Sequence, residues 1–269
     1  MTHNFKNLET NGFVIIKDLL SAEQIEIIKQ DYLEREQRFS LENNNKNYVM
    51  LESSKNFEEC IDPVIHSILA STDLIINCVM PGSGYFNNQL ANLIWHQDHE
   101  CYYRWQDMYN AINCWIPIIK PNPTQSGIKI IPHNFWITES PDIFKKYILG
   151  KGAKYFIKLE NGTTNMHDDS TGDIINLPFN FDDVAITPEL TVGDALILRQ
   201  DIIHQTQDNL DNRVAISIRC RNKYGIVTKS KLLNSFAQQN KMIAQNEKWY
   251  IDFIKKFKNV DQLMIKDLI

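Results

Sequence analysis

The chain has 269 residues, 43% of them hydrophobic, and a formal net charge of −5. This apolar content is enough for a sizeable core and excludes a disordered protein. An acidic balance disfavours non-specific nucleic-acid binding, and no apolar run is long enough to predict a membrane span.

The cysteines and the N-terminal residues predict a cytoplasmic protein. The five cysteines are an odd number and contain no C-x-x-C pair, which favours reduced thiols. The first 17 residues lack the basic start and apolar stretch of a signal peptide. No repeat or Pro-rich linker divides the chain, so we expect one domain over residues 1–269.

The N-terminal part, up to about residue 74, is predicted to be largely helical. Gly12–Ile16 has the composition of a short buried strand. Ser21 and Gln24 form a capping box that predicts the start of a helix. A loop is expected at Glu42–Lys46, and a second helix over Asp62–Leu74 with Pro63 in its first turn.

From about residue 75 to 225 the sequence changes to short β-like runs separated by Gly, Pro and Asn. Such spacing predicts a barrel or a sandwich. The expected strands are Ile75–Met80, Gln89–Trp95, Ala111–Ile119, Gly127–Ile131, Ala185–Thr187, Ala195–Leu198 and Arg213–Cys220. Between them we expect a short helix at Pro141–Leu149 and a polar loop at Asn161–Asp173.

The C-terminal region, residues 226–269, is predicted to be helical. Lys229–Lys256 reads as one helix or a helix pair with an apolar side. The residues of that side are Leu232, Leu233, Phe236, Ile243, Trp249, Tyr250 and Phe253.

Two of the predicted strands carry one plain core face and one mixed face. In Ala111–Ile119 the mixed face includes Asn113 and Trp115, because side chains alternate along a strand. In Arg213–Cys220 the mixed face includes Arg213, Arg219 and small residues between them. Mixed faces of this kind suit a barrel interior that is partly filled by a ligand.

A candidate metal site lies in the segment Trp95–Asp98. On a strand His96 and Asp98 point the same way, and His204 can supply a third ligand from an adjacent strand. Two histidines and one carboxylate on one side of an octahedral metal suit non-haem Fe(II) oxygen chemistry. Arg213 presents a planar, permanently charged fork near the third ligand, and such a fork can hold a carboxylate bidentately.

In these motifs the sequence resembles the phytanoyl-CoA dioxygenase family. The resemblance covers most of residues 8–225 with its blocks in the same order. The matching blocks are Gly12–Glu23, Trp95–Asp98, Asn113–Pro117, Gly127–Pro132, Gly193–Leu196 and His204–Arg213.

The resemblance implies a double-stranded β-helix (jelly-roll) core over about residues 75–225, mainly β with flanking helices. It also implies Fe(II) as cofactor, with 2-oxoglutarate and O2 as co-substrates. Carried over by position, His96, Asp98 and His204 match the iron ligands. Arg213 matches the clamp on the far carboxylate of 2-oxoglutarate.

Three further positions fall in the co-substrate site by the same resemblance. Thr206 matches a hydroxyl beside the far carboxylate, and Trp115 matches an aromatic side chain near the co-substrate. Asn113, on the same face as Trp115, is assigned to that site with it. One block departs from the family: Pro132–Phe135 stands where relatives often have P-G-S-H, which leaves part of the substrate pocket undefined.

The implied reaction is hydroxylation of an unactivated C–H bond of a small metabolite, with release of succinate and CO2. Retention of Asp98 argues against halogenation, because a halide needs the position of that carboxylate. Desaturation, epoxidation and ring formation are not separated from hydroxylation by the sequence. The substrate is expected to be a small molecule, with neither nucleic acid nor membrane as partner, and the oligomeric state is not predicted.

Other interpretations stay open at this point. The same triad could serve a jelly-roll isomerase or hydrolase that does not use 2-oxoglutarate, or a ligand-binding jelly roll without turnover. Arg219 is the alternative clamp, although a structural role is favoured for Arg219 and Arg221. His99 is a lesser candidate for touching substrate.

Two further histidines and two long insertions lie outside these motifs. His133 and His167 are placed in loops and are expected to face solvent. Two inserted loops, Phe135–Lys158 and Asn161–Phe181, are expected to form a lid over the substrate.

Overall fold

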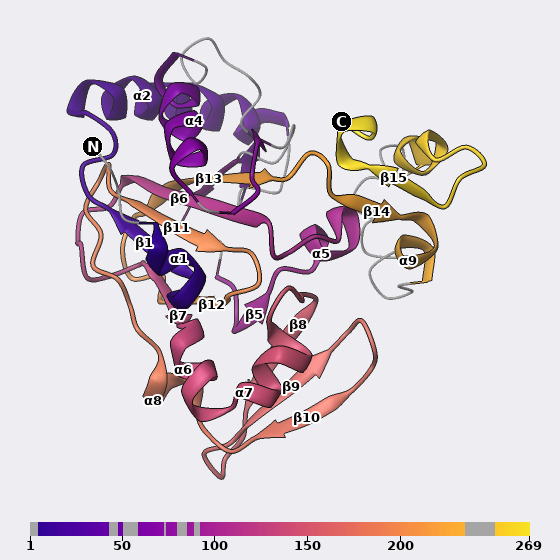
Figure 1. The fold of residues 1–269 in the computed structure, drawn as a ribbon. Helices are drawn as coiled ribbons and strands as arrows, with labels where there is room; N and C mark the ends of the chain where they lie inside the picture. The colour runs from indigo at the N-terminus through magenta and orange to yellow at the C-terminus, as the bar shows by residue number, and fades with distance from the viewer. Residues whose placement is uncertain are drawn as a thin grey trace.

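The computed structural model describes residues 5–42, 48–50, 59–72, 74–79, 85–88, 92–234 and 251–269. Its strands form two antiparallel sheets, with the N-terminal helices on the outer side of the larger one (Figure 1). A small C-terminal pair of strands lies to one side of both.

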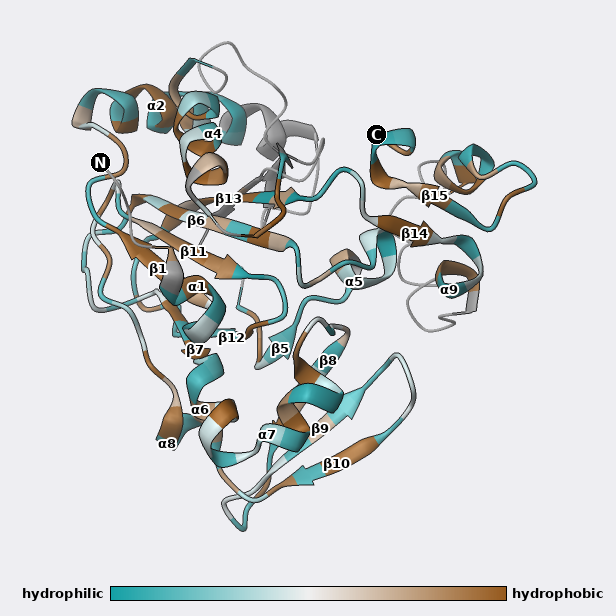
Figure 2. Cartoon of the chain, in the orientation of Figure 1, coloured by the Kyte–Doolittle hydropathy of each residue, from teal (hydrophilic) through white to brown (hydrophobic). Residues whose placement is uncertain are grey.

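The larger sheet has the strand order β1-β11-β6-β13-β4-β2, with β3 also paired to β13. These strands are β1 Phe13–Ile16, β2 Tyr48–Met50, β3 Cys78–Val79, β4 Tyr85–Asn88, β6 Ala111–Ile119, β11 Ala195–Arg199 and β13 Val214–Arg221. Hydrophobic residues concentrate in β6, β11 and β13 at its centre (Figure 2). These central strands confirm the expected positions within one or two residues.

The smaller sheet has the strand order β10-β9-β8-β5-β12-β7. Its strands are β5 His96–Gln97, β7 Ile128–Ile131, β8 Lys154–Lys158, β9 Thr164–Asp168, β10 Ile174–Leu177 and β12 Ile203–Thr206. The predicted strand Ala185–Thr187 is reduced to one bridge, between Ile130 and Ile186. The larger sheet, through its strands β4-β13-β6-β11, faces the strands β5-β12-β7 of the smaller sheet. This arrangement is the mainly β, double-stranded β-helix core that the sequence predicted.

The two faces of the larger sheet differ as the alternation along β6 predicts. Ile112, Cys114 and Ile116 pack with helices α2 (Ala22–Glu42) and α4 (Asp62–Ser71) on the outer side. Trp115 points to the other side and packs between the two sheets. The expected capping box is present at the start of α2, because the Gln24 amide donates to Ser21 Oγ and the Ser21 amide to Gln24 Oε1.

The inserted region between β7 and β11 is not a pair of loops. It begins with α6 (His133–Glu139), α7 (Pro141–Ile143) and a π-helical turn (Phe144–Ile148), which confirm the expected short helix. It then forms β8, β9 and β10, and ends with α8 (Phe181–Val184).

The three inserted strands have a buried outer side that the sequence analysis did not recognise. Phe156, Met166 and Leu177 alternate with exposed or half-exposed residues and pack beneath the insert's helices. The polar loop predicted at Asn161–Asp173 is therefore wrong over β9.

Two other expectations are corrected. The predicted strand Gln89–Trp95 is displaced, because residues 92–95 are not in a strand and the ladder begins at His96, while residues 89–91 lie outside the described residues. In the C-terminal region β14 (Ile226–Thr228) pairs with β15 (Gln262–Met264), so this part is not only helical.

The helices near the C-terminus are shorter than expected. α9 covers Lys229–Asn234, residues 251–256 are again helical, and a 3-10 turn follows at Ile265–Asp267. The rest of the predicted helix, with Phe236, Ile243, Trp249 and Tyr250, lies outside the described residues, as do residues 43–46 of the predicted loop and Met80 of the first predicted strand.

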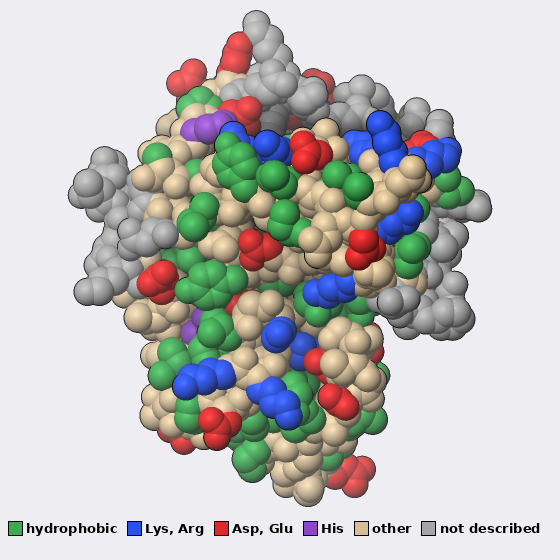
Figure 3. All heavy atoms as spheres, turned by 45° about the vertical axis from the view of Figure 1, so that its right-hand side comes forward, with side chains coloured by type: hydrophobic (Ala, Val, Ile, Leu, Met, Phe, Trp, Pro, Cys, Tyr) green, Lys and Arg blue, Asp and Glu red, His purple; other side chains and the backbone are tan. Residues whose placement is uncertain are grey.

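Helices α1 (Lys6–Asn11) and α5 (Glu100–Trp105) lie beside the core in Figure 1. No helix in the described ranges combines the length and apolar character needed to cross a membrane. On the face in Figure 3, charges of both signs are interspersed with hydrophobic side chains.

A buried ion pair fixes the turn between β11 and β12. The Arg199 guanidinium donates to both carboxylate oxygens of Asp201, from Nε at 2.9 Å and from Nη2 at 2.5 Å. The amide of Gly150 donates to the same carboxylate at 2.7 Å, and both charged side chains are 1% exposed or less. The backbone carbonyl of Asp201 also accepts a hydrogen bond from the Gln97 amide group. This turn therefore ties β5 to the strand that carries His204.

We expect Asp201→Ala to lower the free energy of unfolding by about 3–5 kcal/mol, because Arg199 would remain buried without its counter-charge. Equilibrium urea unfolding of the metal-free protein measures the change. Asp252→Ala is the matched control, since Asp252 pairs with Lys255 on an exposed surface and should cost less than about 1 kcal/mol. Equal losses in the two variants would contradict a structural role for the buried pair.

Candidate metal centre and co-substrate site

The structure brings His96, Asp98 and His204 together between the two sheets. His96 on β5 lies directly opposite His204 on β12 in the strand register. One nitrogen of each imidazole and one oxygen of Asp98 all lie within 4.8 Å of one another. Among the described residues this is the group whose side chains are placed to hold a metal ion together.

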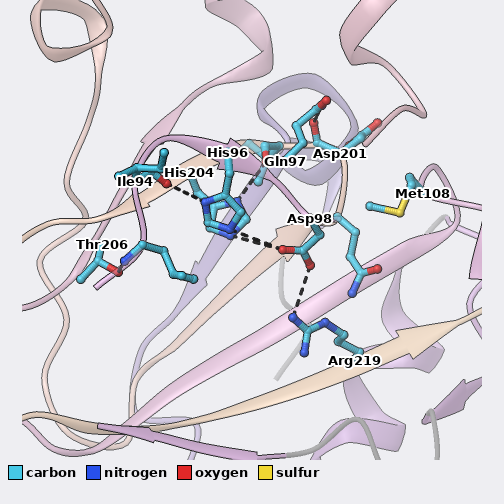
Figure 4. Close-up of polar contacts among 12 residues, drawn as sticks. Ile94, His96, Gln97, Asp98, Met108, Asp201, His204, Thr206 and Arg219 are labelled. Carbon is cyan, nitrogen blue, oxygen red and sulfur yellow. Dashed lines mark hydrogen bonds and ion pairs between the residues drawn. The ribbon is translucent and has the colours of Figure 1, made fainter. Parts of the chain in front are cut away.

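The two histidines present the nitrogen that a metal needs. His96 Nδ1 lies 2.8 Å from the carbonyl oxygen of Ile94, and His204 Nδ1 lies 3.1 Å from that of Ile202. A carbonyl oxygen only accepts, so each Nδ1 carries the proton and each Nε2 keeps its lone pair. Both Nε2 atoms face Asp98 Oδ1, at 3.6 Å and 3.8 Å (Figure 4).

Burial keeps His204 in the form that binds metal. Removal from water, followed by the nearby His96, lowers the pKa of His204 to about 4, against the opposing effect of Asp98. The imidazole is therefore neutral at physiological pH. A neutral imidazole is the ligand form, so no proton has to leave His204 when a metal binds.

Asp98 is held from the opposite sheet by Arg219. Arg219 Nη2 lies 3.4 Å from Asp98 Oδ2, the oxygen that faces away from the histidines (Figure 4). Burial alone would raise the pKa of Asp98, but Arg219 and then the two histidines outweigh it and leave the pKa well below its ordinary value. Asp98 is thus ionised, with one oxygen directed to the imidazoles and the other to a cation.

The position of Arg219 differs from the prediction. A purely structural role was favoured for it, but its contact with Asp98 places it in the site. Arg221 has the expected structural role: its guanidinium is fully buried, donates to the carbonyl oxygen of Asp107 at 2.6 Å and contacts Gln200. The alternation along β13 had already placed Arg219 on the inner face.

Arg213 directly precedes β13 and, like Arg219, lies on the inner side of the larger sheet. It is 2% exposed, and its guanidinium carbon lies 5.8 Å from the centre of the Trp115 ring. Trp115 is itself 2% exposed and packs between the sheets. The structure therefore brings Arg213 and Trp115 together in the core interior.

Thr206 and Asn113 also lie on inner faces. Thr206 Oγ1 accepts a hydrogen bond from the Leu93 amide at 3.0 Å, and the Thr206 amide donates to the Leu93 carbonyl at 3.1 Å. Asn113 stands beside Arg219 in the register of β6 and β13. Its Oδ1 is buried and has no hydrogen-bond donor among the described residues, so it is available to a bound molecule.

The other histidines are placed differently from the predictions. His133 begins α6 and is completely buried, with its ring 5.1 Å from that of Phe144 and close enough to Gly12 that a Cβ there would lie 2.9 Å from it. The departing block Pro132–Phe135 therefore packs against the opening strand. His167 lies in β9 and is half-buried.

His99 lies beside the metal site but is not part of the ligand group. It precedes α5, and its Nε2 lies 3.0 Å from Asp169 Oδ2. Tyr155 was missed by the sequence analysis: it stands opposite His96 on β8. Alternation of Tyr155 and Ile157 with buried Phe156 was the available signal.

Comparisons with solved structures agree on the fold. The chain is similar to EvdO2 from Micromonospora carbonacea var. aurantiaca in complex with 2-oxoglutarate, with 15% identity, a TM-score of 0.51 and coverage of 82% of this chain and 90% of that one. It is similar to SnoN, a non-heme alpha ketoglutarate dependent epimerase from nogalamycin biosynthesis, with 11% identity, a TM-score of 0.51 and 82% coverage of both chains.

A third solved structure, the carbocyclase SnoK from the same biosynthesis, has 11% identity and a TM-score of 0.51 over 83% of this chain and 84% of that one. Neither a protein-family model nor a curated protein matches the sequence. At these identities the likeness establishes the jelly-roll fold. The narrower resemblance to the phytanoyl-CoA dioxygenase family stays a prediction.

We expect Arg219→Met to weaken Fe(II) binding about 10- to 100-fold, because the carboxylate of Asp98 loses the partner that orients it. Anaerobic titration of the metal-free protein with Fe(II) measures the affinity. Arg104→Met is the matched control, since Arg104 lies over the Trp105 ring rather than against the ligands. Tighter binding in Arg219→Met would show that Arg219 acts mainly by repelling the metal, contrary to this expectation.

Proposed function

We propose that this protein is an Fe(II)- and 2-oxoglutarate-dependent oxygenase that acts on a small molecule. The observation that carries the proposal is the convergence of two imidazole Nε2 atoms and one Asp98 oxygen in the interior of a jelly roll. This donor set fits the facial two-histidine, one-carboxylate arrangement of non-haem Fe(II) enzymes.

The ligands fit Fe(II) by their chemistry as well as their number. His96 and His204 are held in the tautomer that presents Nε2, and Asp98 is kept ionised. His96, Asp98 and His204 would hold the metal, and the rest of its coordination sphere would be open to small ligands. With 2-oxoglutarate and O2 the metal supplies oxidation of a C–H bond, with succinate and CO2 as products.

Arg213 is the residue we assign to the far carboxylate of 2-oxoglutarate. A buried guanidinium presents two parallel N–H donors, and a carboxylate matches them. Thr206 is assigned to the same end of the co-substrate, and Trp115 is assigned to a position near the co-substrate, as the resemblance to the phytanoyl-CoA dioxygenase family implies. Asn113 is assigned to the end near the metal, because it stands beside Arg219 on the inner face and its side-chain NH2 group can donate to a carboxylate or keto oxygen.

Hydroxylation is the outcome we propose first. The names of SnoN and SnoK record epimerisation and ring closure by proteins of this fold. The outcome depends on which bond of the substrate lies nearest the metal, which the ligand residues do not set. Epimerisation and ring closure are therefore second candidates at the same site.

We expect Arg213→Lys to weaken 2-oxoglutarate binding at least about tenfold while Fe(II) stoichiometry is retained, because Lys keeps the charge but loses the bidentate fork. Anaerobic titration of the Fe(II)-loaded protein, followed by its visible absorption, measures the affinity. Arg219→Lys is the comparison variant. Unchanged affinity in Arg213→Lys together with a loss in Arg219→Lys would reverse the assignment of the clamp.

We also expect the protein to form succinate slowly from 2-oxoglutarate, Fe(II) and O2 when no substrate is added. Removal of the metal by a chelator, or Asp98→Ala, should abolish this background because the metal site is lost. The isomerase, hydrolase and binding-module alternatives predict no succinate above the metal-free control. A protein that is fully loaded with Fe(II) but does not bind 2-oxoglutarate would refute the proposed function.

A further inference from the structure

The inner face of the inserted strands continues directly from the metal ligands. In the register of the smaller sheet, His96 stands opposite Tyr155, Tyr155 opposite His167, and His167 opposite Ile174. Partners across neighbouring strands share a face. At about 4.8 Å between strands, His167 stands roughly 10 Å from His96.

We call this surface the inner strip. It consists of the inward-facing residues of β8, β9 and β10, which are Tyr155, Ile157, Asn165, His167, Ile174 and Asn176. Exposure increases away from the metal ligands, from half-buried Tyr155 and His167 to Ile157 at 43% and Ile174 at 62%. The strip is thus accessible at its far end and meets the metal site at its near end.

The aromatic pair on the strip presents polar edges. The Tyr155 and His167 rings are stacked, with their centres 4.6 Å apart and their planes 13° from parallel. Rings stacked across strands stand up from the sheet, so their edges point away from it. Neither the Tyr155 hydroxyl nor the His167 ring nitrogens have a hydrogen-bond partner among the described residues.

The charges around the strip disfavour an anionic ligand. Its described residues include no Lys or Arg. The neighbouring lysines form ion pairs with carboxylates that are not part of the strip: Lys154 pairs with Asp168, and Lys158 pairs with Asp182. Asp169, two residues after His167, is paired with His99. The strip therefore offers hydroxyl, imidazole and amide groups together with exposed isoleucines.

We propose that the inner strip binds the substrate and that the substrate is an uncharged ring compound bearing hydroxyl groups. Hydroxyl groups both donate and accept, so they match the Tyr155 hydroxyl, the His167 ring and the amide of Asn165. The apolar face of such a ring covers Ile157 or Ile174. The proposed function is needed to say which carbon of the substrate reacts at the metal. Binding of the substrate to the inner strip does not depend on it.

The test uses Zn(II)-loaded protein with 2-oxoglutarate, so that binding is measured without turnover. The probes are phenyl β-D-glucoside, phenyl β-D-galactoside and trans-cyclohexane-1,2-diol, with phenyl β-D-glucoside 6-phosphate and ethylbenzene for comparison. Saturation-transfer NMR gives the dissociation constants. We expect a neutral hydroxylated probe to bind at least about tenfold more tightly than both comparison compounds.

The variants locate the binding on the strip. Tyr155→Phe and His167→Leu should each weaken the preferred probe about three- to tenfold, the effect of one lost hydrogen bond. Tyr147→Phe is the matched control, because Tyr147 packs with the hydrophobic cluster on the outer side of the sheet. Zn(II) stoichiometry and unfolding curves confirm that each variant is folded.

Three results would overturn the proposal: no neutral probe binds, the phosphorylated probe binds as tightly, or both strip variants keep the affinity of the unchanged protein. Succinate formation by the Fe(II) protein is measured separately. If probes bind through the strip but 2-oxoglutarate does not bind, the proposed function fails and the binding surface stands. If succinate forms but no probe binds, the inference about the substrate fails alone.

Discussion

The antiparallel pairing of β5 with β12 sets His96 opposite His204, and the remainder of the site is arranged around that pair. β5 is only two residues long, so its own ladder does little to fix the register. The Gln97 side chain supplies the missing constraint, because its amide donates to the carbonyls of Ile148 and Asp201. Asp201 is in turn held by Arg199, so a fully buried polar network determines where the two imidazoles meet.

The two sheets contribute different chemistry to the interior. The smaller sheet and the turn after β5 supply the two imidazoles and Asp98, whereas the larger sheet and the residue before β13 supply the cations Arg219 and Arg213. A carboxylate buried among apolar residues would tend to become protonated and lose its value as a ligand. Arg219 prevents this from the opposite sheet, so packing of the two sheets and ionisation of Asp98 depend on each other.

The sequence predicted the parts of the structure that alternation and motif spacing control. Side chains alternate between the two faces of a strand, and this alternation predicted the two faces of β6 and the inward positions of Arg213 and Arg219. The structure agrees with both predictions. His96 and Asp98 also point to the same side, as predicted, although Asp98 lies past the end of β5. Pairing continues one step further there, because the Ala153 amide donates to the Asp98 carbonyl.

The inserted strands could not be predicted in the same way. In β9 the inward residues Asn165 and His167 and the neighbouring Asp168 are all polar, so the segment has the composition of a loop. Only Met166 marks its buried side, and that side becomes apolar only when Phe156 and Leu177 are brought next to it. The pairing of β14 with β15 was equally hidden, since the two strands are separated by 33 residues along the chain.

The insert extends the smaller sheet at the edge of β5. An exposed edge strand with unpaired backbone groups is a liability, and β8 covers it. The same pairing places Tyr155 beside a metal ligand at a distance fixed by the strand spacing. Packing of the insert depends on its outer residues, such as Phe156 and Met166, which belong to the hydrophobic cluster beneath its helices. Residues that recognise a substrate can therefore change on the inner strip without loss of the register that positions the metal ligands.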